Sequence, residues 1–155
     1  RLRLDHLHTL EERWAALFYS SEEKTVTPMY MTKKQKKEIA ALLEGLERVS
    51  KEGWTSYFLY IYGLEMSKKI SRLEESFVGK TVITETEIEQ RYKRLPIQKR
   101  SDLAVTPQDL LQFLQKKQGR WLGETMKQIE QLVVEEKLEN QKDAIYEFVA
   151  KGGRS

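Results

Sequence analysis

The chain has 155 residues, of which 39% are hydrophobic and 10% aromatic, a composition that argues against disorder and suits one domain or two small lobes. The absence of cysteine excludes disulfides and thiolate metal sites, and no apolar run approaches the roughly 18 residues of a membrane span. With 27 basic and 24 acidic residues, the chain as a whole is only weakly basic.

The first helix is signalled by Thr9 and Glu12, which fit a capping box. Apolar residues then recur at helical spacing, and we expect the face that they form to turn toward the core: Leu10, Trp14, Leu17 and Phe18. Residues 20–31 contain a proline and are expected to form a loop. A second capping box, Thr32 with Gln35, opens the next helix.

The middle of the chain continues as helices. Residues 56–62 (SYFLYIY) have no polar face, so this short helix is expected to be central to the core, and Gly63 interrupts it. A further helix is predicted to end at Gly79, and Thr84 opens another. Pro96 stops that helix, and we place a lobe boundary there.

Three more helices are predicted after the boundary. Thr106 followed by a proline is a strong helix start, and this helix is expected to end at Gly119. A longer helix follows from about Trp121 to Lys137, and Asn140 is expected to cap the last one.

Together these signals predict an all-α protein of about eight short to medium helices in two packed lobes, residues 1–95 and 96–155, with no substantial sheet. The chain begins with Arg1 rather than methionine and runs almost at once into a helix. We therefore expect the first lobe to be truncated at its N-terminus.

The sequence lacks motifs for catalysis of its own. The eight glycines are scattered and form no phosphate-binding loop, and there is no His-Glu-x-x-His pattern. His6 and His8 are the only histidines, and we interpret them as solvated rather than as metal ligands. Adjacent glutamates are interpreted as solvated helix faces: Glu11 and Glu12, Glu74 and Glu75, Glu135 and Glu136. We predict no catalytic residue and no metal site.

Positive charge is concentrated between residues 91 and 120. Eight basic and two acidic residues give this stretch a balance of 8 − 2 = +6, whereas the whole chain carries 27 − 24 = +3. A concentrated positive field indicates a polyanionic partner such as nucleic acid. A second basic run, residues 33–37, is interpreted as a solvated helix start, with RNA contact as the alternative. The three tryptophans lie on apolar faces and are interpreted as core residues rather than as base-stacking residues.

Four passages of the second half follow one another in a characteristic order. They are RYKRLPIQKRSDLAV (91–105), DLL (109–111), GRWLGE (119–124) and LENQKDAIY (138–146). In this order they resemble the C-terminal end of bacterial CCA-adding enzymes, the tRNA nucleotidyltransferases that build the CCA 3′ end of tRNA. Looser similarity extends through EERWAAL (11–17). The chain departs from the family pattern at residues 106–107, where Asn-Gly is frequent, and at residues 116–120, where glycine and proline are common.

The resemblance implies the body and tail of such an enzyme without its head and neck. The family's Gly-Gly and Arg-Asp phosphate-binding stretch, Asp-x-Asp metal pair and Asp/Glu-x-x-Arg nucleotide template are missing from this sequence. In the family, body and tail hold the elbow side and T arm of tRNA while the head adds nucleotides. The implied partners are tRNA and the head and neck of the same polypeptide, in the cytoplasm, with no membrane and no indicated homo-oligomer. No cofactor is expected in this segment; Mg²⁺, CTP and ATP are expected in the head.

Double-helical RNA is recognised mainly through phosphates, 2′-hydroxyls and shape, which favours exposed cations on a rigid scaffold. The predicted RNA-binding residues are Arg94, Lys99, Arg100, Lys116, Lys117 and Arg120. Two alternatives stay open at the sequence level. One is a helical protein-interaction module that docks through residues 56–62, and the other is a small basic DNA-binding domain with residues 108–117 as its recognition helix.

Overall fold

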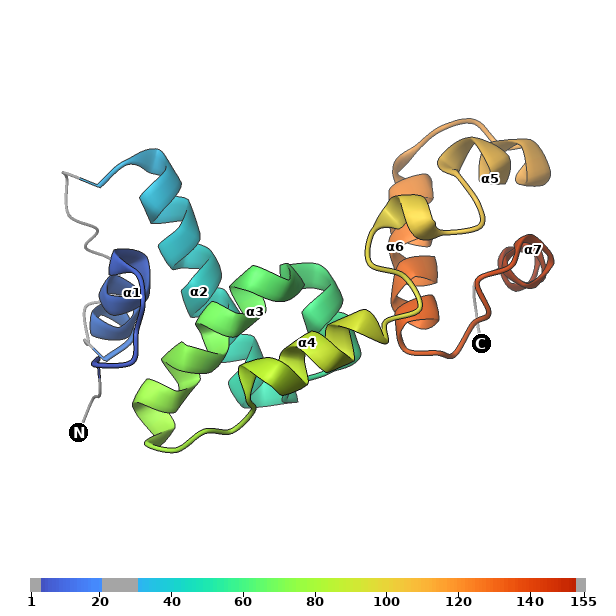
Figure 1. Cartoon of the computed structure of the whole chain (residues 1–155). Helices are drawn as coiled ribbons and strands as arrows, with labels where there is room; N and C mark the ends of the chain where they lie inside the picture. The colour runs from blue at the N-terminus through green and yellow to red at the C-terminus, as the bar shows by residue number, and fades with distance from the viewer. Residues whose placement is uncertain (1–3, 21–30, 153–155) are drawn as a thin grey trace. The chain divides into compact units, whose positions relative to one another are not determined.

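The computed structural model describes residues 4–20 and 31–152, and this part of the chain contains seven α-helices, one short 3₁₀-helix and no strand (Figure 1). In chain order the elements are α1 (Leu10–Ser20), α2 (Lys33–Glu52), α3 (Ser56–Val78), α4 (Glu85–Lys93), η1 (Arg100–Asp102), α5 (Pro107–Leu114), α6 (Arg120–Val134) and α7 (Lys142–Ala150). The prediction of an all-α protein is confirmed. Most of the predicted loop, residues 21–30, lies outside the described residues.

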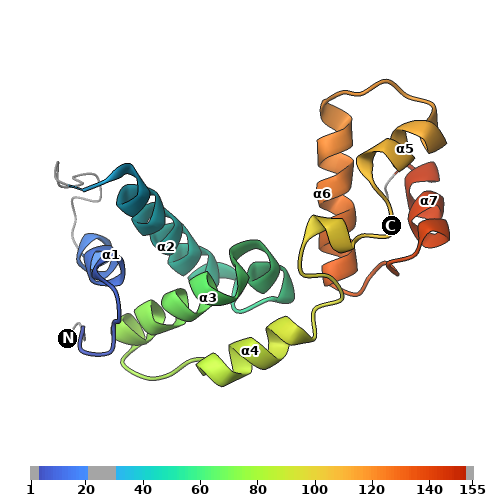
Figure 2. The same ribbon diagram turned by 45° about the horizontal axis from the view of Figure 1, so that its top comes forward.

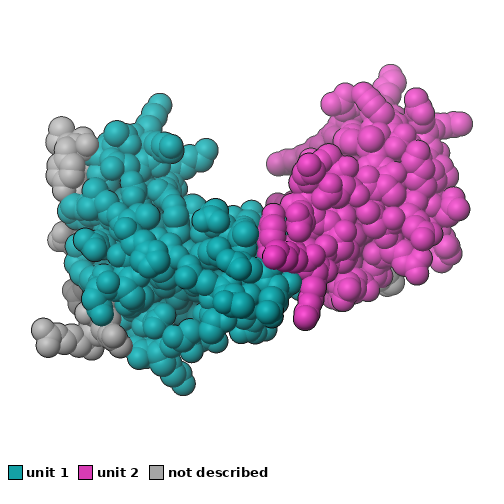
Figure 3. Space-filling model, in the orientation of Figure 1, with its two compact units in different colours: residues 1–91 teal, residues 92–155 magenta. Residues whose placement is uncertain are grey.

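The chain divides into two compact units, residues 1–91 (unit 1) and residues 92–155 (unit 2), which Figure 3 shows in different colours. The division falls near the end of α4, four residues before the predicted boundary between residues 95 and 96. Each unit has its own buried apolar residues, among them Phe58 and Ile70 in unit 1 and Met126 and Ile129 in unit 2. No helix within the described residues combines the length and apolarity that a membrane crossing needs.

In unit 1, the helices α1, α2 and α3 pack against one another in all three pairs (Figure 1). The start of α2 confirms the predicted capping box. The Thr32 hydroxyl accepts a hydrogen bond from the Gln35 N–H at 3.1 Å, and the Gln35 side chain accepts one from the Thr32 N–H at 3.0 Å. Helices α2 and α3 approach closely at Gly45, where a Cβ atom would lie 2.3 Å from Cδ1 of Ile70.

The face of α1 that packs against the rest of unit 1 is not the predicted one. Ala15 and Ala16 are fully buried, whereas Leu10 is 56% and Leu17 is 44% exposed. Small side chains let the backbone of α1 approach its neighbours closely, and hydrophobic spacing alone does not reveal such an approach. The prediction that Leu10 and Leu17 face the core is therefore wrong, and Trp14 is only half-buried.

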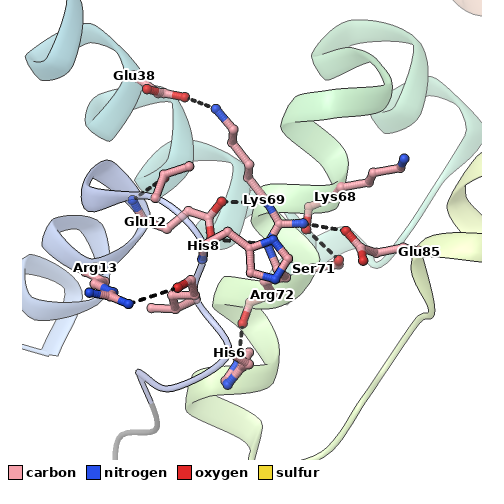
Figure 4. A network of polar contacts seen from close by, with 12 residues as sticks. His6, His8, Glu12, Arg13, Glu38, Lys68, Lys69, Ser71, Arg72 and Glu85 are labelled. Atoms are coloured by element: carbon pink, nitrogen blue, oxygen red, sulfur yellow. Dashed lines mark hydrogen bonds and ion pairs between the residues drawn. The ribbon is translucent and has the colours of Figure 1, made fainter.

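Glu12 is a fully buried carboxylate on the packed face of α1, where Arg72 of α3 holds it (Figure 4). Arg72 donates Nη2–H to Oε1 at 2.6 Å and Nε–H to Oε2 at 3.2 Å, and the backbone N–H of His8 donates a third bond at 3.0 Å. Arg72 also pairs with Glu85. Burial lowers the pKa of Arg72, but its bonds with the two glutamates outweigh burial and raise it.

Two further interpretations change in unit 1. The predicted capping box at Thr9 is half formed: its hydroxyl accepts a bond from the Glu12 N–H at 3.1 Å, while the Glu12 carboxylate bonds His8 instead of returning to Thr9. Glu74 is buried and accepts the Nε1–H of Trp54 at 2.9 Å. The interpretation of adjacent glutamates as solvated is therefore wrong for Glu12 and Glu74, because each is buried beside a donor that is distant in the chain.

Helix α3 is interrupted at Gly63, whose φ of +79° and ψ of 175° are not helical. The predicted break is confirmed, and because helical hydrogen bonding resumes at once, two predicted helices form one element. Before the break, Tyr57, Phe58 and Leu59 are buried, whereas Ile61 is 43% exposed. The first turn of this segment is therefore central to the core and its later part is not, and the buried residues are not free to act as the docking surface of a protein-interaction module.

In unit 2, α5 packs against both α6 and α7 (Figure 2). The inward face of α6 is formed by residues at helical spacing, since Leu122, Met126, Ile129 and Val133 are all buried. The segment that leads into α5 is irregular but anchored by buried apolar side chains: Leu95, Ile97, Leu103 and Val105. Its polar and charged residues therefore project from a fixed backbone.

Candidate nucleic-acid interface

Helix α5 begins as predicted but ends early. The Thr106 hydroxyl accepts the Asp109 N–H at 3.2 Å, and the Asp109 carboxylate accepts the Thr106 N–H at 2.9 Å. The helix stops at Leu114, and Gln115 adopts the left-handed conformation with φ +52°. The prediction that α5 runs to Gly119 is wrong, because the residues after Leu114 are polar and no apolar side chain continues the buried face. Residues 115–119 thus form a loop, which we call the α5–α6 turn.

Two of the six predicted RNA-binding residues, Lys116 and Lys117, lie in the α5–α6 turn, and both are exposed. The Lys116 ammonium lies 5.3 Å from the centroid of the Trp121 ring, within cation–π range. The Trp121 Nε1–H donates to the carbonyl oxygen of Lys117 at 2.9 Å. Trp121 is half-buried, and its ring contacts the Lys116 ammonium and the Lys117 carbonyl oxygen. These two contacts order the turn, a role that the sequence did not reveal.

The N-terminus of α6 adds a third cation to this turn. Gly119 is the N-cap and supplies no side-chain hydrogen bond, and no acidic residue occupies the first turn of the helix. Arg120, the first residue of α6, has a side chain that is 94% exposed, and Glu124 is 3.9 Å from it. The unsatisfied N–H groups of a helix start carry partial positive charge, so the backbone and the three side chains have the same sign here.

Lys99 and Arg100 lie on a second structured turn, at η1. The Asp102 carboxylate accepts the backbone N–H groups of Gln98 at 3.0 Å and of Lys99 at 3.3 Å. Asn140 binds the other end of this turn: its Nδ2–H donates to the Asp102 carbonyl at 2.8 Å, and its Oδ1 accepts the Ala104 N–H at 2.7 Å.

The predicted cap of the last helix is therefore wrong. The N-cap of α7 is Gln141, which makes no side-chain capping bond, and Asn140 acts as a clamp on η1 instead. The signal that could have identified this role is the placement of Asn140 in an irregular segment, but its partners lie 36 and 38 residues earlier in the chain.

The six predicted residues do not form a single cluster. Arg100 pairs with Glu130, the eleventh residue of α6, whereas Arg120 is the first. Ten residues of α-helix correspond to roughly 15 Å. Lys116, Lys117 and Arg120 are brought together at the start of α6, and Arg100 is held further along it. Arg94 is exposed just beyond the end of α4.

A groove of about 140 Å³ adjoins the α5–α6 turn. Its lining residues come from the end of α5, the turn, one side of α6 and the end of α7: Leu114, Lys116, Trp121, Thr125, Gln128, Val149 and Gly152. Of the six predicted residues, Lys116 alone contributes to this groove. The other five cations are exposed, which suits contact with a phosphate backbone.

The second basic run opens α2 in unit 1. Its lysines span an arc of about 160° on the helix surface, opposite the buried residues of α2. They are Lys33, Lys34, Lys36 and Lys37. The positive charges of these lysines oppose the helix dipole, because the N-terminal end of a helix is itself partially positive. No acidic residue in the first turn offsets them.

The histidines and acidic residues form no metal-binding group of three or more among the described residues. His6 is engaged in the fold, since its Nε2 lies 2.8 Å from the carbonyl oxygen of Arg72 and 3.1 Å from the hydroxyl of Ser76. The interpretation of His6 as a solvated side chain is therefore wrong. His8 is exposed, as predicted.

Comparisons with known proteins agree with the resemblance in the sequence. The model of the family tRNA nucleotidyltransferase domain 2 matches residues 5–149. The chain is 30% identical over 136 residues to the CC-adding tRNA nucleotidyltransferase of Halalkalibacterium halodurans, in a match that covers 88% of this chain and 36% of that protein. It is 33% identical over 117 residues to the CCA-adding enzyme of Bacillus cytotoxicus, covering 75% of this chain and 29% of the relative.

A solved structure gives the same result in three dimensions. The crystal structure of the Bacillus stearothermophilus CCA-adding enzyme in complex with CTP is similar with a TM-score of 0.83 and 27% sequence identity. The likeness covers 99% of this chain and 40% of that one. The chain therefore spans well under half the length of the relatives that it matches.

Proposed function

Because this chain belongs to the family of CCA-adding tRNA nucleotidyltransferases, we propose that it forms the tRNA-binding body and tail of such an enzyme. It holds the elbow side and T arm of tRNA while a head and neck outside this sequence add C, C and A to the 3′ end. Mg²⁺, CTP and ATP bind in that head, and this chain alone is inactive.

One observation carries the proposal: residues 5–149 match a domain of tRNA nucleotidyltransferases. The matches with individual relatives cover only 36% and 29% of those proteins. The arrangement of unit 2 supports it. Lys116, Lys117 and Arg120 are exposed around a helix N-terminus that has no side-chain cap. Backbone N–H groups and cations at a helix start are well suited to bind phosphate oxygens.

The proposal is tested by titrating this chain with tRNA between 50 and 200 mM salt. If about four phosphates are neutralised, affinity should fall on the order of 100-fold over this range, because counterions are released on binding. Duplex DNA at the same salt is the competitor that separates RNA binding from DNA binding. A flat salt dependence, or equal competition by DNA, would contradict the proposal.

The triple variant Lys116→Ala, Lys117→Ala, Arg120→Ala locates the interaction. We expect weaker tRNA binding and a salt slope reduced by roughly two to three, with little change in the urea unfolding curve. A matched control removes three exposed cations that each pair with a nearby glutamate: Lys51→Ala, Lys137→Ala and Lys151→Ala. Equal losses in both triple variants would mean that net charge, rather than the α5–α6 turn, determines affinity.

A further inference from the structure

An aromatic pair on the surface of unit 2 is not explained by the packing of the core. Phe113 of α5 stacks on Tyr146 of α7 with ring centroids 4.2 Å apart and an interplanar angle of 9°. Phe113 is nevertheless 42% exposed, and it is the only phenylalanine or tryptophan among the described residues to be exposed rather than buried or half-buried. The other large exposed apolar side chains are aliphatic.

The two rings are fixed by the way in which α5 and α7 pack. One turn before the rings, Lys142 of α7 lies 3.8 Å from the Asp109 carboxylate of α5. The steps from Asp109 to Phe113 and from Lys142 to Tyr146 are each four residues, so both contacts follow the same line between the helices. Tyr146 supports one face of the Phe113 ring, and this support reduces the entropy that would be lost if a flat ligand stacked on it.

Both lysines and acidic residues lie near the rings along the chain, but the lysines of the α5–α6 turn have no acidic neighbour within three residues. Lys142 precedes Tyr146 by one turn of α7, and Lys116 and Lys117 follow Phe113 by three and four residues. A single pair of rings is far smaller than the several hundred Å² of apolar surface typical of a protein-docking site. Flat aromatic surface flanked by cations instead matches a nucleotide, which presents a flat base and a phosphate.

We propose that the Phe113–Tyr146 pair is a stacking platform for a base of the bound RNA, with Lys116 and Lys117 of the α5–α6 turn neutralising an adjacent phosphate. The proposal rests on the proposed function, because it requires an RNA ligand. The base must have a face that no neighbouring base covers, and its identity matters little because every base has such a face. The Phe113–Tyr146 pair would therefore add base stacking to an interface whose other proposed contacts are between cations and phosphates.

The test uses Phe113→Leu, which keeps an apolar side chain but removes the aromatic face. Two polyanions serve as probes: tRNA, and inorganic polyphosphate, which carries charge but no bases. We expect Phe113→Leu to weaken tRNA binding by roughly 10-fold and to leave polyphosphate binding unchanged. The double variant Lys116→Gln, Lys117→Gln should weaken binding of both probes, because it removes charge rather than stacking.

Phe113→Trp supplies a readout that a structural role would not change. It should retain tRNA affinity and show tryptophan quenching by tRNA beyond that of the parent chain, without added quenching by polyphosphate. If Phe113→Leu weakens both probes alike or neither, the stacking proposal is overturned while the proposed function stands. If the parent chain does not bind tRNA, both proposals fall.

Discussion

One site in each unit uses charged residues in a way opposite to the other: the Glu12–Arg72 pair in unit 1 and the α5–α6 turn in unit 2. In unit 1, Glu12 is fully buried and held by Arg72, whose side chain is only 13% exposed. In unit 2, Lys116 and Arg120 are exposed, and the 3.9 Å between Arg120 Nε and Glu124 Oε1 makes a loose ion pair between two exposed side chains. Charged residues therefore hold helices together at the first site and remain accessible to a ligand at the second.

The difference has a thermodynamic basis. A buried ion pair has already lost its water, so removing one partner leaves an uncompensated charge in the interior. An exposed cation keeps its hydration and its counterions, and it can release those counterions when a phosphate approaches. Burial, rather than the number of charges, therefore decides which cations are available to RNA.

The largest expected effect comes from breaking the buried pair. Arg72→Met leaves the Glu12 carboxylate without its positively charged partner, and we expect the free energy of unfolding of unit 1 to fall by about 3–5 kcal/mol. Urea unfolding followed by circular dichroism measures this change. Lys51→Met, at an exposed pair with Glu47, is the control and should leave the curve unchanged. A small effect of Arg72→Met would mean that water reaches Glu12.

Arg100 is an intermediate case, because its own side chain is 54% exposed while that of Glu130 is 10% exposed. Arg100→Met should lower the free energy of unfolding by about 1–2 kcal/mol, since Glu130 loses a donor. The double variant Arg100→Met, Glu130→Gln should recover part of that loss. The single variant Arg100→Met should reduce tRNA affinity less than Lys116→Met does. A larger loss in Arg100→Met would assign Arg100 to the RNA-binding cations.

The smallest expected effect concerns the Asp109 cap of α5. Hydrogen bonds from Thr106, assisted by Lys142, hold the pKa of Asp109 below its ordinary value of 3.8. A lowered folded-state pKa stabilises the fold above pH 3.8, and this contribution is lost as pH falls through the folded-state value. Unfolding curves measured between pH 6 and pH 3 should therefore lose less stability in Asp109→Asn than in the parent chain. Parallel losses in the two proteins would show that other groups dominate.

Local signals predicted well those features that depend on neighbouring residues. The capping box at Thr32, the helix start at Thr106 and the break at Gly63 were predicted because cap and backbone preferences act over three or four residues. The early end of α5 at Leu114 was missed, because polar residues such as those at 115–118 can continue a helix on its solvent side or leave it. Only the packing of α5 against its neighbours decides between the two. The clamp at Asn140 was missed because its partners are distant in the chain.

The sequence by itself determined the helical class, most helix starts and the concentration of positive charge near residues 91–120, because these follow from composition and short spacing. Only the tertiary structure decided that α1 packs through its alanines, that Glu12 is buried, and that Phe113 is supported by Tyr146 at the surface. The physical reason is that burial depends on how closely two helices approach, and that approach is a property of pairs of elements rather than of any one segment.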